Sequence, residues 1–301
     1  MNRAIVVAKR SGWQRLVEET KDAHVLALLA ANDPSVARMR SAHDEHLRAV
    51  DETVDALARA GVGIAELAAP GVPFDEGDVG LVVTVGGDGT LLAASHHVSR
   101  ARVLGVNSAP AHSVGFFCGV RSGSVALALA RLAADELPRV TLTRMTVRRN
   151  REIVSRRVLN DALVCHVSPA ATSRYELAHG DAIEDQRSSG FWIGPAAGST
   201  AAQRSAGGEV LPLDGDALQL VVREPYTPEG RALTLRRLLI PAGDTLRVRS
   251  KMLDARLFLD GPSEATSLTL GDVLEFTRSD EPVVVLGLSP SRERFSALAP
   301  V

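Results

Sequence analysis

Residues 81–92 read LVVTVGGDGTLL, an apolar run that leads through a glycine-rich segment into more apolar residues. The run from Leu81 to Val85 is mostly β-branched, which is typical of a strand covered on both faces in a parallel sheet. The turn after it carries three glycines, Gly86, Gly87 and Gly89. Glycine lets the backbone come close to a ligand. The stretch therefore predicts a buried strand, a ligand-binding loop and then a helix.

The helix is expected to begin at Leu91, with Thr90 or Asp88 as its N-cap. Free N–H groups at the start of a helix favour an anion, so the loop is predicted to hold phosphate. An aspartate there repels phosphate unless it has a separate task. Asp88 is therefore interpreted either as a group that orients a hydroxyl nucleophile or reaches a phosphate-bound metal ion, or only as a cap in the turn.

Segment 85–90, VGGDGT, resembles the GGDGT signature of the NAD kinase family and of related diacylglycerol and sphingosine kinases. Neither G-x-x-x-x-G-K-[ST] nor G-x-G-x-x-G occurs in this stretch. The resemblance implies that Asp88 is catalytic and that the residues around it bind the phosphates of ATP, namely Gly86, Gly87, Gly89 and Thr90.

Composition limits the remaining possibilities. A chain of 301 residues suits about two domains, and a net charge of −2 without a basic run gives no reason to expect nucleic acid or an anionic membrane as a partner. Cys118 and Cys165 are the only cysteines, which suggests a reducing compartment. No apolar run reaches membrane-spanning length and the first strand is too short for a signal peptide, so a cytoplasmic location is expected.

The chain before the glycine loop begins with a predicted strand over 1–8, which Lys9 and Arg10 follow. These two cations could meet phosphate, although an exposed pair is the simpler interpretation. Apolar residues from Val36 onward recur at helical spacing until Gly61, which predicts an amphipathic helix.

The chain after the glycine loop continues the pattern, with a helix expected from Leu91 to about Ser99 and another over 124–134. The buried run 103–107 between them ends in Asn107. Ligands of open α/β sheets collect at the carboxyl ends of the strands, so we expect Asn107 to face the same crevice as Asp88 and to bind the phosphates of ATP. Phe116 lies in a segment that resembles the family's substrate-facing turn; it is interpreted as stacking on a ring of the substrate or as a core residue.

Helical periodicity stops near Pro138, and strand-like segments follow. They lie at 140–147, 158–167, 217–222, 245–249, 255–259 and 273–276. We predict an N-terminal Rossmann-like α/β domain over 1–137 and a C-terminal antiparallel β-sandwich over 138–281. The tail 282–301 could belong to either domain; the resemblance implies that it completes the first and that the second binds dinucleotide.

Asn160 and Asp161 each begin a strand face that is otherwise apolar, within the segment VLNDALVC. Buried polar groups are costly without partners, and ligand hydroxyls would supply them; the alternative is a turn that enters the strand. The segment resembles the family's Asn-Glu motif, with Asp161 in place of Glu. The resemblance implies that both residues bind the dinucleotide.

Residues 187–208 are rich in small side chains and resemble the family's T-G-S-T-A-Y-x-x-S-A-G-G motif, which the lipid kinases lack. The resemblance implies dinucleotide contacts at Ser189, Gly198, Ser199, Thr200, Ala201 and Ser205. Three residues depart from the usual pattern, at Ser189, Ala197 and Ala202. The same small residues occur in the plant-type NADH kinase branch, which this region resembles more closely.

The resemblance implies an enzyme that transfers the γ-phosphoryl group of ATP to the 2′-hydroxyl of NADH or NAD. Mg²⁺ would enter with ATP rather than at a protein metal site, and the chain would form a homodimer or homotetramer. A non-catalytic dinucleotide-binding regulator and a lipid kinase are the alternatives. The sequence alone does not separate NADH from NAD as acceptor, or ATP from polyphosphate as donor.

Overall fold

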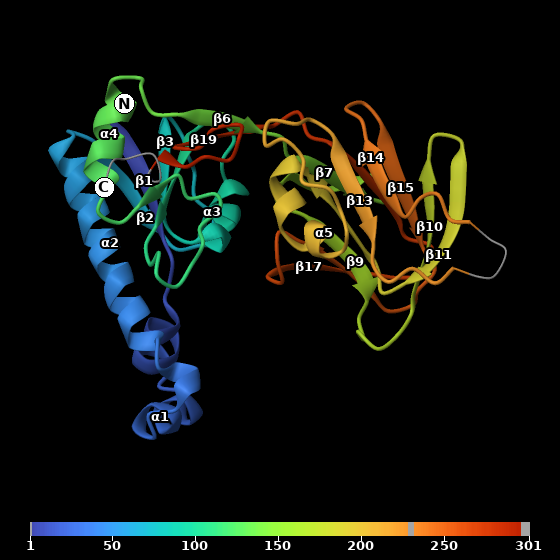
Figure 1. Ribbon diagram of the computed structural model, residues 1–301, viewed down its shortest axis with the longest axis horizontal. Helices are drawn as coiled ribbons and strands as arrows, with labels where there is room; N and C mark the ends of the chain where they lie inside the picture. The colour runs from blue at the N-terminus through green and yellow to red at the C-terminus, as the bar shows by residue number, and fades with distance from the viewer. Residues whose placement is uncertain (1, 228–231, 296–301) are drawn as a thin grey trace. The chain divides into compact units, whose positions relative to one another are not determined.

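The computed structural model describes residues 2–227 and 232–295, shown in Figure 1. The chain forms two compact units, one of Met1–Val140 with Val284–Val301 and one of Thr141–Val283. The boundaries expected from the sequence were 1–137 with 282–301, and 138–281. No helix in the described ranges is both long and apolar enough to cross a membrane.

The first unit is built on a sheet in the strand order β2-β1-β3-β4-β19-β6, with β5 paired to β4; the pairings among β1, β2, β3, β4, β5 and β19 are parallel. Its strands are β1 (Arg3–Ala8), β2 (Gly63–Ala68), β3 (Leu81–Gly86), β4 (Arg102–Asn107), β5 (Val120–Arg121), β6 (Arg139–Leu142) and β19 (Val283–Leu286). Its helical segments are η1 (Gln14–Glu19), α1 (Ala23–Ala30), η2 (Pro34–Val36), α2 (Met39–Arg59), α3 (Asp88–Ser95) and α4 (Val125–Ala133).

Helices cover both faces of this sheet, which explains why β3 is buried along its whole length. One face packs on α2 and α4, whose buried side chains share a core with Val83 and Val85. The other face packs on α3. Leu91 of α3 lies so close to Gly105 of β4 that a Cβ added to this glycine would be 3.0 Å from Leu91 Cδ1. Figure 1 shows α3 across the sheet from α2 and α4. The α/β prediction for this unit is confirmed.

The second unit consists of two antiparallel sheets, ordered β11-β10-β15-β18-β7-β8 and β14-β13-β12-β9-β16-β17. The strands are β7 (Met145–Arg149), β8 (Glu152–Val158), β9 (Ala162–His166), β10 (Ser173–His179), β11 (Ala182–Ser188), β12 (Phe191–Pro195), β13 (Leu218–Val222), β14 (Arg237–Ile240), β15 (Thr245–Ser250), β16 (Ala255–Leu259), β17 (Glu264–Leu268) and β18 (Val273–Arg278). The short helical segments η3 (Ala196–Thr200) and α5 (Ala202–Ser205) follow β12.

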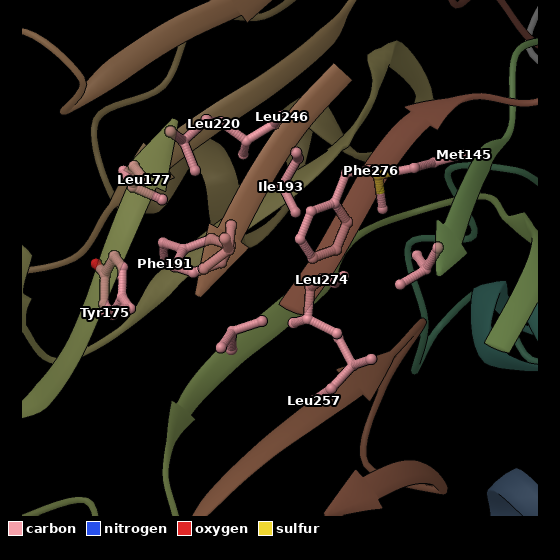
Figure 2. Close-up of a cluster of buried hydrophobic side chains, with 14 of the residues drawn as sticks. Met145, Tyr175, Leu177, Phe191, Ile193, Leu220, Leu246, Leu257, Leu274 and Phe276 are labelled. Atoms are coloured by element: carbon pink, nitrogen blue, oxygen red, sulfur yellow. The ribbon is translucent and has the colours of Figure 1, made fainter. Parts of the chain in front are cut away.

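The core of this unit lies between the two sheets, and alternate residues of several strands, such as Phe191 and Ile193 of β12, point into it (Figure 2). The ring of Phe191, from one sheet, lies 5.0 Å from Tyr175 and 6.1 Å from Phe276, both from the other. Such aromatic pairs stabilise a core beyond their buried area. The predicted β-sandwich is confirmed.

Two predicted strands are interrupted. The segment 140–147 forms β6 and β7, separated at the fully buried Arg144. The guanidinium of Arg144 donates to the carbonyl oxygens of Glu281 and Pro282. These bonds hold the first residues of the second unit to its last ones. The segment 158–167 is also broken, because β8 ends at Val158 and β9 begins at Ala162.

The helix after the glycine loop also differs from its prediction. It spans Asp88–Ser95 rather than beginning at Leu91, and its N-cap, Gly87, has no side chain to cap with. Neither Thr90 nor Asp88 caps it, since the carboxylate of Asp88 is bonded elsewhere. The predicted cap was wrong because the partners of Asp88 are distant in sequence.

Candidate active site

The glycine loop folds tightly around the start of α3. The N–H of Thr90 donates to the carbonyl of Gly87 at 3.0 Å, and the N–H of Ser108 donates to that of Gly86 at 3.0 Å. A Cβ on Gly86 would lie 2.2 Å from Oγ1 of Thr90, and one on Gly87 would lie 2.9 Å from Oγ of Ser113. Side chains at either position would collide with these hydroxyls, so the loop needs glycine there.

Asp88 is half-buried, and its carboxylate holds a second turn of the chain. Oδ2 accepts the backbone N–H of Phe116 at 2.9 Å, and Oδ1 accepts that of Phe117 at 2.7 Å. A carboxylate offers about four acceptor positions, so both oxygens keep capacity for a further donor such as a substrate hydroxyl. The side chain of Phe116 is 51% exposed, and therefore is not a core residue.

Asn107 lies under the same turn rather than at its surface, being 2% exposed. Its Nδ2 donates to the carbonyl of Ser113 at 2.9 Å, and its Oδ1 accepts the N–H of Ala109 at 3.3 Å. Gly115, with φ of +60°, packs directly on the Asn107 amide. Asn107 therefore shapes the turn that Asp88 holds, and its amide has protein partners instead of facing the pocket.

A pocket of about 760 Å³ opens on the glycine loop. Its lining residues are Gly87, Asp88, Gly89, Thr90 and Ser113 of the two turns, together with Lys9, Arg10, Arg15 and Pro70. Three of the predicted phosphate-loop residues, Gly87, Gly89 and Thr90, thus share a single cavity with one carboxylate and three cations, whereas Gly86 does not line it.

The second predicted cluster lies in the β-sandwich, where Asn160 and Asp161 occupy the bend between β8 and β9. The carboxylate of Asp260 accepts three consecutive backbone N–H groups of this bend, at 2.7–3.1 Å, from Leu159, Asn160 and Asp161. These N–H groups would otherwise join a strand ladder. Asp260 therefore explains why the predicted continuous strand breaks here.

Asp161 is 5% exposed, and its Oδ2 accepts a hydrogen bond from the Asn160 amide at 2.9 Å. Burial, with a smaller contribution from the charge of Asp260, raises the pKa of Asp161 to about 7. Both causes disfavour the ionised form. The carboxyl group is thus poised to exchange a proton near neutral pH.

Glycines of the small-residue block pack against the same bend. A Cβ on Gly198 would lie 1.6 Å from the carbonyl oxygen of Asn160, and one on Gly194 would lie 2.4 Å from it. Ser199 is fully buried; its hydroxyl donates to the Ala196 carbonyl at 2.7 Å and accepts the Leu211 N–H at 2.9 Å. Ser199 therefore holds the loop in shape.

The remaining predicted residues of this unit are placed differently. Thr200 and Ala201 are half-buried beside Ser199, and Ser205 is exposed at the end of α5. Ser189, which is half-buried, precedes the five-residue strand β12, whereas Gly198 follows it. A strand of that length spans about 16 Å, so the chain itself does not bring Ser189 to the Asn160 cluster.

Comparison with known proteins agrees with this arrangement. The profile of the ATP-NAD kinase N-terminal domain matches residues 17–137. A probable NADH kinase of Oryza sativa subsp. japonica is 35% identical over 230 residues, covering 69% of this chain and 70% of the relative. The chain belongs to the NAD kinase family.

Other members extend the comparison. The NADH kinase of Arabidopsis thaliana is 31% identical over 245 residues, covering 72% of this chain and 77% of its own. The crystal structure of an NAD kinase from Archaeoglobus fulgidus in complex with ATP is 20% identical, with a TM-score of 0.66 over 94% of this chain and 92% of the other. The latter likeness shows the NAD kinase fold.

Two residues that hold the two loops of the site in place were not identified as functional from the sequence. One is Asp260, whose carboxylate accepts three backbone N–H groups that lie about 100 residues earlier in the chain. Arg294 donates to the carbonyls of Val114 and Gly115 at 2.6 and 3.0 Å, and so supports the turn held by Asp88. No local pattern around either residue signals these contacts.

Proposed function

We propose that the chain is an NAD(H) kinase, which transfers the γ-phosphoryl group of ATP to the 2′-hydroxyl of the adenosine ribose of NADH or NAD. The observation that carries the proposal is the Asp88 carboxylate, which lines one pocket with the glycine loop and retains acceptor capacity. Relatives also support the proposal, because a protein named probable NADH kinase is 35% identical to this chain and one named NADH kinase is 31% identical.

In this mechanism Asp88 aligns the 2′-hydroxyl and accepts its proton as the new P–O bond forms. The bond between the γ-phosphorus and the ADP oxygen breaks at the same time, and ADP leaves. Phosphoryl transfer passes through a loose transition state, so alignment and neutralisation of charge supply most of the catalysis. A carboxylate is a weak base toward an alcohol, and proton transfer therefore comes late.

The other predicted residues divide between the two ligands. We assign the backbone of Gly86, Gly87 and Gly89, with Thr90, to the phosphates of ATP, and Mg²⁺ enters as the counterion that ATP carries. Phe116, through its exposed ring, and the bend at Asn160 and Asp161 belong to the dinucleotide. Gly198, Thr200, Ala201, Ser205 and Ser189 are assigned to the dinucleotide as well, and Asn107 and Ser199 to support of the two loops.

The proposal includes a homodimer or homotetramer in the cytoplasm. Both cysteines are free thiols, which suits a reducing compartment. Size-exclusion chromatography with light scattering measures the oligomeric state directly, and a monomer at working concentration would contradict that part of the proposal.

A coupled assay for NADPH and NADP tests the reaction. Purified chain is supplied with Mg²⁺-ATP and with NADH or NAD in parallel, and the two rates identify the preferred acceptor. We expect the phosphorylated dinucleotide and ADP in equal amounts. Dinucleotide binding without product from either acceptor would overturn the kinase and leave a nucleotide-binding regulator.

A further inference from the structure

The phosphate pocket takes its positive charge from a part of the chain outside the GGDGT loop. Residues 81–95, which form β3, the loop and α3, contain no lysine or arginine. The backbone N–H groups of the loop carry only partial charge, and Asp88 adds a negative charge to the same cavity. A polyphosphate bound there needs cations from elsewhere.

Three cations line that pocket together with the loop, Lys9 just after β1, Arg10 after it and Arg15 in η1. Parallel pairing of β1 with β3 sets Ala8 opposite Val85, and the Lys9 N–H donates to the Val85 carbonyl at 3.0 Å. Lys9 and Gly86 therefore leave the sheet side by side at its carboxyl edge. The register of the sheet thus places an ammonium beside the glycine loop.

The three side chains differ in how far they are constrained. Lys9 is half-buried, and burial lowers its pKa, an effect that Glu45 and Cys118 partly oppose. Partial burial also strengthens its attraction to a phosphate, since solvent screens it less. Arg10 is exposed and paired with Glu19, but a guanidinium keeps further donors after one pairing. Arg15 is exposed.

We propose that Lys9, Arg10 and Arg15 form the cationic wall of the phosphoryl-donor site and bind the phosphate groups of a linear tri- or polyphosphate, with Lys9 as the central contact. The inference rests on the proposed function for the identity of the donor but not for the binding of polyphosphate. It replaces the interpretation of Lys9 and Arg10 as merely an exposed pair.

The test is equilibrium binding, by isothermal titration calorimetry, of inorganic tripolyphosphate and of Mg²⁺-ATP to the full chain without dinucleotide. The variants are Lys9→Met, Lys9→Arg and Arg15→Gln. Arg59→Gln is the matched control, because Arg59 is an exposed cation at the end of α2 and does not line the pocket. Thermal unfolding of each variant verifies that it is folded.

We expect Lys9→Met to weaken binding of both ligands by roughly tenfold to a hundredfold, the range for losing a hydrogen bond to a charged group. Lys9→Arg should recover most of the loss, Arg15→Gln should show a smaller one, and Arg59→Gln none. In turnover, the KM for ATP should rise in Lys9→Met while the KM for dinucleotide stays unchanged. Added salt should weaken binding to the wild type more than to Lys9→Met.

Wild-type affinity for both ligands in Lys9→Met and Arg15→Gln would overturn the inference. If Lys9→Met does not fold, the affinity of Arg15→Gln still tests the inference, because Arg15 is exposed and its replacement disturbs no buried group. If both variants turn over substrate with an unchanged KM for ATP, the inference about the cationic wall is wrong while the proposed kinase activity stands. Lys9-dependent binding of tripolyphosphate in a chain without kinase turnover would support the wall and remove the kinase.

Discussion

The Asp88 carboxylate accepts the backbone N–H of Phe117 at 2.7 Å, and its second oxygen accepts that of Phe116 at 2.9 Å. One side chain therefore stands at the start of α3 and also fixes the turn that presents Phe116 to solvent. The geometry of this turn should matter both to stability and to dinucleotide binding.

Gly115→Ala is expected to distort that turn. Gly115 has a φ of +60°, and an added Cβ would lie 2.6 Å from Nδ2 of Asn107. Gly123→Ala is the matched control, because Gly123 has a φ of +89° but open space around it. A positive φ costs an alanine about 1–2 kcal/mol. Calorimetric unfolding should show a larger loss for Gly115→Ala, with a raised KM for dinucleotide; equal losses would contradict the packing argument.

Gly198→Ala should damage the bend at Asn160 in the other unit. The added Cβ would lie 1.6 Å from the carbonyl oxygen of Asn160, too close for any real contact. Gly80→Ala, which meets no atom within 4 Å and has no positive φ, is the control. We expect Gly198→Ala to lose dinucleotide binding by titration while still binding tripolyphosphate. Retained dinucleotide affinity would show that the bend can shift without loss.

Asp260→Asn should loosen the same bend from its other side. The amide retains one acceptor oxygen for three N–H groups that Asp260 now accepts, so buried donors lose partners. Such a loss costs about 1–3 kcal/mol. Asp280→Asn serves as control, since the Asp280 side chain is 82% exposed. Denaturant unfolding should separate the two variants, and similar midpoints would refute the anchoring role of Asp260.

Asp161 should give the stability of the chain a distinctive pH dependence. Its pKa rises from 3.8 to about 7 on folding, so between these values the folded chain keeps a proton that the unfolded chain has released. The contribution of Asp161 is therefore fully present below the unfolded pKa and lost as the pH rises through about 7. Asp161→Asn should gain stability relative to wild type as the pH rises from about 4 to about 7, measured by denaturant unfolding. Parallel profiles would contradict this assignment.

Local patterns in the sequence predicted the parts of this fold that depend on local composition. The run Leu81–Val85 is apolar at almost every position, which is the composition of a strand covered on both faces. It is fully buried in β3, as that composition predicts. The change from helices to strands near Pro138 likewise reflects hydrophobic period, and the β-sandwich begins a few residues later.

Contacts between residues far apart in the chain were beyond such reasoning. The predicted helix start was wrong because Asp88 binds N–H groups 28 and 29 residues later instead of capping α3. The strand at Asn160 breaks because Asp260 binds it from about 100 residues away. Lys9 meets the glycine loop only through the register of β1 with β3, which the sequence does not specify.

The most direct test of the account is a paired measurement on Asp88→Asn, of kcat in the coupled assay and of dinucleotide Kd by titration. The variant keeps an acceptor for one of the two backbone N–H groups but cannot take a proton from the 2′-hydroxyl. We predict that turnover falls by at least about a hundredfold while dinucleotide affinity stays within a few-fold. Turnover close to that of the wild type in a folded variant would contradict the role of Asp88 in phosphoryl transfer.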